Sequence, residues 1–263
     1  MVSKKNVDRV SLKQQTSRAV SSVDQIREFF SENTELFSDP DQIMPAILDG
    51  QLCLDMIATV AVAQQPQIKR VLDLGCGGGN ASNLLLQKLQ SKAPNLRNQL
   101  PDVNLTLVDL SREMLQTAEK SLAKRTSGII KTHAQDIRKL SLKENHYDVI
   151  LCSLVLHHLR HEREWLDTYK QLHTALRPGA SLFVFDLVDI TSSSIHQDAY
   201  TRYGQYLSKT VDDEYRDFVF DHIKQEDTPR SLLWQIDQLR AIGFSEVDIL
   251  HKHLCYAAFN AIK

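Results

Sequence analysis

The fold is decided by the stretch Val71-Leu72-Asp73-Leu74-Gly75-Cys76-Gly77-Gly78-Gly79-Asn80. An apolar segment of strand length runs into a glycine-dense turn, and a helical pattern follows from residue 81. Glycine lets the backbone turn sharply and lets a ligand approach without a Cβ in the way. The stretch therefore predicts a strand, a ligand-binding loop and a helix, an arrangement that several nucleotide-binding folds share.

The residues around the glycines favour one kind of ligand. A GxGxxG dinucleotide fingerprint that began at Gly75 or Gly77 would need Gly or Ala at position 80 or 82, where Asn80 and Ser82 stand. The loop also lacks the GK[ST] ending of a P-loop. Asp73 would repel a pyrophosphate but would attract an ammonium or a sulfonium. We therefore expect a cationic ligand and disfavour an NAD-dependent dehydrogenase.

Strands alternate with helices around this loop. Strand-like apolar runs occupy residues 70–74, 105–110, 128–133, 147–153 and 181–187, and helical patterns occupy 81–89, 111–123 and 162–176. Such alternation predicts a parallel sheet with right-handed crossovers and helices on both faces.

The end of the chain follows a different pattern. Thr228-Pro229 predicts an N-cap and a first helical residue, and Gly243 stands just past the expected end of that helix. Strands near 244–250 and 254–262 are joined by too few residues for a crossover, so they must form an antiparallel hairpin. The expected fold is a Rossmann-like α/β domain with a mostly parallel seven-stranded sheet, a C-terminal antiparallel hairpin and helical lid segments.

Acids stand at the ends of the second and third expected strands. Open α/β sheets bind ligands at this edge. A carboxylate at Asp109 can accept both ribose hydroxyls of a nucleoside. Asp109 could instead cap the next helix, but Ser111 is better placed for that role. Asp136 could accept the exocyclic amine of adenine while Ile137 packs on the ring, or it could be a surface loop acid.

Composition narrows the function classes. Lys and Arg total 31 against 33 Asp and Glu, so the net charge of −2 gives no general attraction to nucleic acid, although it leaves room for a local basic patch. No apolar stretch approaches the ~18 residues of a membrane span, and the N-terminus lacks the apolar run of a signal peptide. Four cysteines without a CxxC pair suit reduced thiols, so we expect a cytoplasmic protein.

The chain resembles the class I, or seven-stranded, S-adenosylmethionine-dependent methyltransferases. The motifs that carry the resemblance are VLDLGCGGGN at 71–80, LVDLSREML at 107–115, AQDI at 134–137, YDVILCSLVLHHL at 147–159 and LRPGASLFVFD at 176–186. The resemblance implies S-adenosylmethionine as cofactor and S-adenosylhomocysteine as product, with Asp73 orienting the loop and the methionine amine. It further implies cofactor contacts from Gly75, Gly77, Asp109, Leu110, Met114, Asp136, Ile137 and the Cys152–Ser153 backbone.

On this basis we divide the chain into five segments. They are a mobile basic tail (1–22), an N-terminal helical lid (23–65), the cofactor-binding α/β core (66–190), a helical lid insertion (191–227), and a terminal helix with the hairpin (228–263). The insertion carries the aromatic residues Tyr200, Tyr203, Tyr206, Tyr215, Phe218 and Phe220, together with His196 and His222. The aromatic residues could form an acceptor site, pack as ordinary helices or make a homodimer interface.

Methyl transfer needs alignment more than a dedicated base. We nevertheless name His158, ahead of His157, as the candidate that removes a proton from the acceptor; either could instead be a packing or capping histidine. We expect no metal, because these histidines and His161 do not form an HExxH pattern.

The expected acceptor is a small molecule. Alternatives are a tRNA-modifying enzyme and a non-catalytic cofactor-binding regulatory subunit. The tRNA-modifying enzyme would either methylate tRNA or make a carboxylated cofactor for its modification. In the second case Arg202 is the candidate cation that would hold the extra carboxylate.

Overall fold

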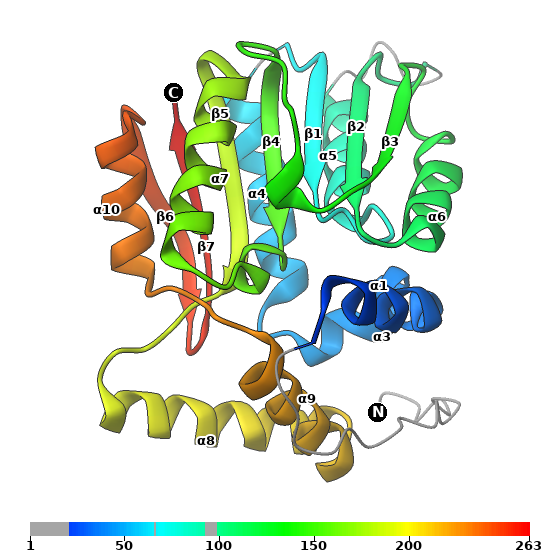
Figure 1. Cartoon of the computed structure of the whole chain (residues 1–263). Coiled ribbons are helices and arrows are strands. Elements are labelled where there is room, and N and C mark those ends of the chain that lie inside the picture. Colours follow the sequence, from blue (N-terminus) through cyan, green and yellow to red (C-terminus); the bar gives the residue numbers. More distant parts are fainter. Residues whose placement is uncertain (1–20, 66, 93–98) are drawn as a thin grey trace.

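The computed structural model describes residues 21–65, 67–92 and 99–263, and its described strands form one seven-stranded sheet (Figure 1). The strand order is β3-β2-β1-β4-β5-β7-β6. The bounds are β1 Arg70–Leu74, β2 Asn104–Asp109, β3 Ile130–Ala134, β4 Tyr147–Ser153, β5 Leu176–Leu187, β6 Glu246–His253 and β7 Tyr256–Ile262. β1 to β5 are parallel, and β7 pairs antiparallel with both β5 and β6. This confirms the expected fold class and the terminal hairpin.

Alternation along the strands divides the core between the two faces of the sheet. On one face Val71 and its neighbours pack against α4 Gly50–Gln64, α5 Asn80–Lys92 and α6 Arg112–Leu122. On the other face Leu72 and Leu74 pack against α7 Glu162–Ala175 and α10 Leu232–Ile242. Helices therefore cover both faces, as the strand–helix alternation predicted.

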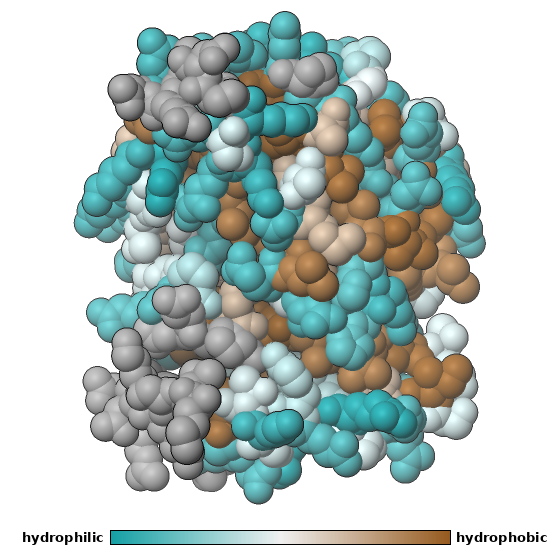
Figure 2. All heavy atoms as spheres, turned by 180° about the vertical axis from the view of Figure 1, so that it is seen from behind, coloured by the Kyte–Doolittle hydropathy of each residue, from teal (hydrophilic) through white to brown (hydrophobic). Residues whose placement is uncertain are grey.

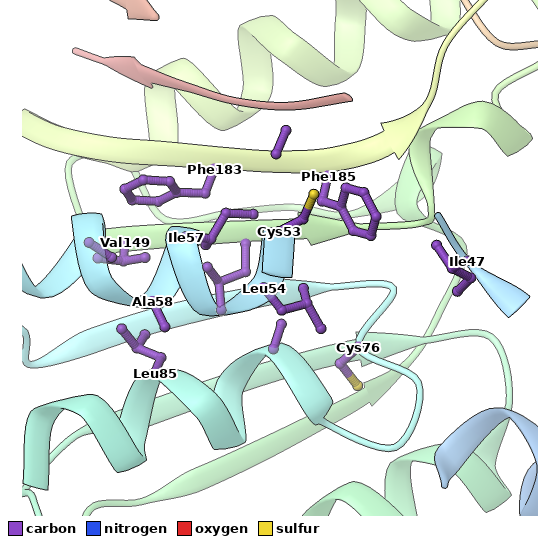
Figure 3. Close-up of a cluster of buried hydrophobic side chains, with 14 of the residues drawn as sticks. Ile47, Cys53, Leu54, Ile57, Ala58, Cys76, Leu85, Val149, Phe183 and Phe185 are labelled. Carbon is purple, nitrogen blue, oxygen red and sulfur yellow. The ribbon is translucent and has the colours of Figure 1, made fainter. Parts of the chain in front are cut away.

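Helix α4 corrects part of the expected N-terminal lid. Its Cys53, Leu54, Ile57 and Ala58 recur at helical spacing and are buried. Figure 3 shows them between Phe183 and Phe185 of β5 on one side and Leu85 of α5 on the other. Since this helix completes the core, the lid predicted for 23–65 can include only the residues before α4.

The segment before α4 consists of short helices at the carboxyl ends of the parallel strands (Figure 1). They are α1 Val23–Glu32, α2 Thr34–Ser38, α3 Pro40–Ile43 and the 3-10 turn η1 Met44–Ala46. Ser22 begins α1 in a capping box with Gln25, and the hydroxyl of Ser21 donates to Glu226 at 2.8 Å. The expected mobile tail lies outside the described residues up to position 20, but Ser21 and Ser22 belong to the folded structure.

The insertion after β5 forms two helices, α8 Ser193–Thr210 and α9 Asp213–Glu226, as expected. The helix after them begins later than predicted. Ser231 caps α10 by accepting from the amide of Trp234, whereas the Thr228 hydroxyl donates to the carbonyl of Leu159. The Thr228 hydroxyl, which the sequence predicted as a helix cap, is thus used in a tertiary hydrogen bond instead. Gly243 ends α10 with φ 118°, as predicted.

The outer surface is mixed in character. On the face shown in Figure 2, hydrophobic residues gather in patches among hydrophilic ones. Among the described residues, no helix combines the length and the apolar character needed to cross a bilayer.

Candidate functional site

A cavity lies where the parallel strands end and α1 to α3 cover the sheet edge. We call the sheet side the floor; its members include Asp73, Gly75, Cys76, Gly77, Gly78, Asn80, Asp109, Leu110, Met114, Asp136, Ile137, Arg138, Ser153 and His158. We call the helical side the roof; its lining residues are Val23, Ile26, Phe30, Phe37, Ile43 and Met44. Every predicted site residue lines the cavity except Cys152, whose side chain is buried inside the sheet.

The glycine loop meets both the ligand space and the roof. Gly77 has φ 49°, and a Cβ added there would meet no atom within 4 Å, so this backbone faces open space. A Cβ at Gly78 would instead lie 2.5 Å from the Cβ of Ser38 in α2. The first glycine thus permits close approach of a ligand, and the second permits the roof to touch the floor.

Two carboxylates stand beside the loop, Asp73 buried and Asp109 half-buried. Asp73 is 1% exposed and accepts a 2.6 Å hydrogen bond from the hydroxyl of Ser82. Its pKa is raised to about 6, because burial and, to a smaller extent, the charge of neighbouring Asp109 outweigh the lowering effect of the Ser82 bonds. Asp109 accepts from the amides of Gly77 and Ser111, each at 2.9 Å, yet burial still raises its pKa.

These acids suit the cofactor that the sequence implies. A raised carboxylate pKa means that the ionised form lacks full compensation where it is buried. A ligand with positive charge would supply that compensation, whereas a pyrophosphate would add repulsion. Together with the open space beside Gly77, these two carboxylates fit a cationic nucleoside. Ser111 caps α6 through a bond from the amide of Met114, as predicted, which leaves Asp109 at the cavity.

The third acid has a partner that sequence reasoning missed. Arg138 binds both carboxylate oxygens of Asp136, with its closest contact at 2.6 Å, and also binds Glu164 at 2.9 Å. Burial would raise the pKa of Asp136, but the bonds and charge of Arg138 outweigh it and lower that pKa. An arginine two residues after the acid was visible in the sequence, but its fork onto the carboxylate depends on the turn at Ile137.

The two adjacent histidines have different surroundings. His157 is buried, and its Nδ1 bonds to Asp186 at the end of β5. Burial would lower the pKa of His157, but Asp186 and Asp227 raise it to about 9. His158 lines the cavity instead, and its Nδ1 lies 3.2 Å from Oδ1 of Asp227. The fold therefore buries His157 beside Asp186, and His158 is the one of the two that lines the cavity.

Sequence reasoning missed two acids that contact these histidines, Asp186 and Asp227. Asp186 also accepts from the amide of Leu156 at 2.7 Å and so shapes the turn that carries both histidines. Its position at a strand end, like that of Asp109, could have identified it. Asp227 follows α9, and no sequence pattern relates it to His158. Burial would raise its pKa, but the two histidines hold it below its ordinary value.

The insertion of residues 191–227 does not line the cavity. Tyr203 packs in the core and its hydroxyl lies 3.1 Å from that of Tyr256, which supports ordinary helix packing. Phe218 and His222 stack on Phe29 of α1, so this insertion supports the roof from outside. Arg202, the candidate cation for a carboxylated cofactor, is exposed and pairs with Asp198 instead.

Part of the chain is similar to known methyltransferases. A family model described as "Methyltransferase domain" matches residues 72–182. The malonyl-[acyl-carrier protein] O-methyltransferase of Paenibacillus sp. (strain JDR-2) is 29% identical over 140 residues, 51% of this chain and 46% of that protein. The chain thus spans less than half the length of the curated relatives it matches.

Solved structures share the fold over most of the chain. The 1,6-didemethyltoxoflavin-N1-methyltransferase of Burkholderia thailandensis, with bound 1,6-didemethyltoxoflavin and S-adenosylhomocysteine, has TM-score 0.57 and 15% identity, covering 94% of this chain and 93% of that one. Human N-acetylserotonin methyltransferase in complex with S-adenosylmethionine has TM-score 0.51 and 18% identity, covering 92% and 56%. S-adenosylmethionine is the cofactor of this family. Residues 72–182 therefore match the methyltransferase-domain family, and the chain has the fold of the class I S-adenosylmethionine-dependent methyltransferases.

Proposed function

We propose that this protein transfers a methyl group from S-adenosylmethionine to a small-molecule acceptor, with S-adenosylhomocysteine as product. The observation that carries the proposal is one cavity with a glycine loop and three carboxylates on its floor and an apolar roof opposite them. When bound, the cofactor supplies an electrophilic methyl group on a sulfonium. Because transfer is an in-line displacement, the acceptor atom must meet that methyl group from the side opposite the sulfur.

We assign the cofactor to the floor. Asp73 would face the methionine amine. Asp109 would accept the ribose hydroxyls with the carboxylate lone pairs that the amides of Gly77 and Ser111 do not use. The adenine would lie near Asp136, with Ile137 as its packing partner. Further contacts would come from Gly75, Leu110, Met114, Ser153 and the backbone of Cys152. The raised pKa values of Asp73 and Asp109 support this assignment, because a cationic ligand would relieve both.

We assign the acceptor to the space between His158 and the roof. The ring centroids of Phe30 and His158 lie 5.8 Å apart. Val23, Ile26 and Phe37 add apolar walls that exclude water. Holding two reactants aligned in such a space can lower a barrier by up to ~7–11 kcal/mol. His158 would remove the acceptor proton, with Asp227 as the positioning residue that orients its ring.

Calorimetry tests the cofactor assignment directly. We expect S-adenosylmethionine and S-adenosylhomocysteine to bind and NAD not to bind, and we expect labelled methyl groups to enter metabolites of a cell extract. Asp109→Ala should weaken cofactor binding by about 1.5–3 kcal/mol, the usual contribution of a hydrogen bond to a charged group. Asp198→Ala, on the exposed surface of α8, is the matched control and should bind normally.

The outcomes separate the alternatives. Unchanged affinity in Asp109→Ala would refute the ribose placement, and binding of NAD alone would refute the whole proposal. Labelled methyl groups entering tRNA with strongly salt-dependent binding would identify a tRNA-modifying enzyme. Tight cofactor binding without any turnover would identify a regulatory subunit. We propose a cytoplasmic location, since all four cysteines are free and buried.

A further inference from the structure

A second cluster of ligating side chains lies apart from the cavity. Asp49 stands between η1 and α4, while His251 and His253 lie on the edge strand β6. Nε2 of His251 is 2.8 Å and Nδ1 of His253 is 2.7 Å from the same carboxylate oxygen, Oδ2 of Asp49. The three ligand atoms all lie within 4.8 Å of one another. None of the three residues lines the cavity.

The backbone explains why these side chains meet. Alternate residues of a strand point to one face, so His251 and His253 present their rings together. Both are paired with β7, His251 opposite Ala258 and His253 opposite Tyr256, so the strand holds their spacing. A register shift between Ile249 and His251 sets which face they occupy.

Asp49 is positioned for the histidines and not for its own helix. It occupies the N-cap of α4, yet its side chain accepts no helix amide, and its carboxylate instead faces the two imidazoles. Its φ of 53° lies in the left-handed region, which Asp tolerates better than most residues. The backbone thus gives up a helix cap in order to bring a carboxylate to a histidine pair.

We propose that Asp49, His251 and His253 bind a divalent transition metal ion, with zinc as the ion that their chemistry fits best. Two imidazoles and one carboxylate supply three of the four ligands of tetrahedral Zn²⁺ and leave one position for water. The side chains are 36%, 27% and 45% exposed, so an ion can reach them from solution. Zinc-to-ligand distances near ~2.0–2.2 Å put ligand atoms about 3.3 Å apart. The two ring nitrogens lie 2.8 and 2.7 Å from the Asp49 oxygen, so both pairs would open slightly to admit the ion.

A metal at this position would join two parts of the fold. It would tie the edge strand β6 to Asp49, the residue just before α4. Ile43 and Met44, a few residues earlier in the chain, line the cavity. The site therefore acts as a clamp that holds the start of α4 against the sheet. This role does not depend on the proposed methyl transfer.

Zinc binding to the EDTA-treated full chain tests the clamp. We expect calorimetry with ZnCl₂ to show one site per chain and the thermal midpoint to rise when zinc is added. His253→Gln and His251→Gln should each weaken zinc binding at least tenfold, because losing even a hydrogen-bond partner of a metal ligand typically costs about 10–100-fold in affinity. His133→Gln, an exposed histidine on β3 at the opposite edge of the sheet, is the matched control and should bind normally.

The same variants separate a metal site from a hydrogen-bonded brace. For a metal site, His253→Gln abolishes the zinc-dependent rise of the thermal midpoint, while its midpoint in EDTA stays near that of the parent. For a brace alone, the midpoint in EDTA falls and zinc adds nothing to either protein. Zinc binding that survives both His251→Gln and His253→Gln would overturn the proposal, because the ion would then be held elsewhere.

Discussion

The floor and the roof of the cavity differ in how firmly they are built. Floor residues extend from the central strands, and Asp73 beside the loop is almost fully buried. In the roof, α1 has no buried residue at all. It is held by bonds such as the one that the Ser31 hydroxyl donates to Ser111 at 3.0 Å. A rigid floor suits recognition of a constant cofactor, and a lightly held roof suits the entry and exit of ligands.

The largest expected effect concerns His158, where floor and roof meet. Gln has a similar size but cannot take a proton, so His158→Gln should lower methyl-transfer turnover by about 10²–10⁴-fold, the usual contribution of general base catalysis. Cofactor affinity measured by calorimetry should stay near that of the parent. Asp227→Asn should lower turnover less, because it keeps a polar side chain beside the ring. Parent-like turnover in His158→Gln would remove this residue from the mechanism.

The next effect tests the cost of the charged floor. The pKa of Asp73 is raised from 3.8, its value in the unfolded chain, to about 6 in the folded protein. The contribution of this group to the free energy of unfolding is therefore fully present below pH 3.8 and is lost as the pH rises through 6. Since one pKa unit is worth ~1.4 kcal/mol, the ionised group costs about 3 kcal/mol at neutral pH. Asp73→Asn should therefore raise the free energy of unfolding of the cofactor-free protein by about that amount.

Urea denaturation at pH 7.5 and at pH 4 measures this difference. The gain of Asp73→Asn should be present at pH 7.5 and mostly absent at pH 4, where the parent carboxyl is protonated. Cofactor affinity at pH 7.5 should fall in the same variant. Asp198→Asn, an exposed control, should change neither property. A variant that is less stable than the parent at pH 7.5 would contradict the assigned cost.

The smallest effect concerns the contact between roof and floor. An added methyl group at Gly78 would overlap Ser38, and overpacking of this kind costs about 1–3 kcal/mol. We expect Gly78→Ala to push α2 away, so that the amides of α1 and α2 exchange hydrogen faster while those of α5 do not. Hydrogen-exchange mass spectrometry measures both. Equal acceleration in α5 would show that floor and roof open as one unit.

Much of the floor could be predicted from the sequence because its signals are local. The glycine loop, the acids at strand ends, the Ser111 cap and the short link of the hairpin each depend on neighbouring residues and on the common direction of parallel strands. Those rules bring Asp73, Asp109 and Asp136 to one edge whatever the side chains around them.

The remainder depends on contacts between segments far apart in the chain. Asp227 reaches His158 across about 70 positions, Asp49 meets His251 across about 200, and α4 joins the core although it follows the roof helices. Periodicity shows that α4 has apolar residues but not which surface they cover. Local patterns thus specify each element and its ends, whereas the packing of whole elements chooses which side chains become partners, because that choice follows from burial summed over the entire fold.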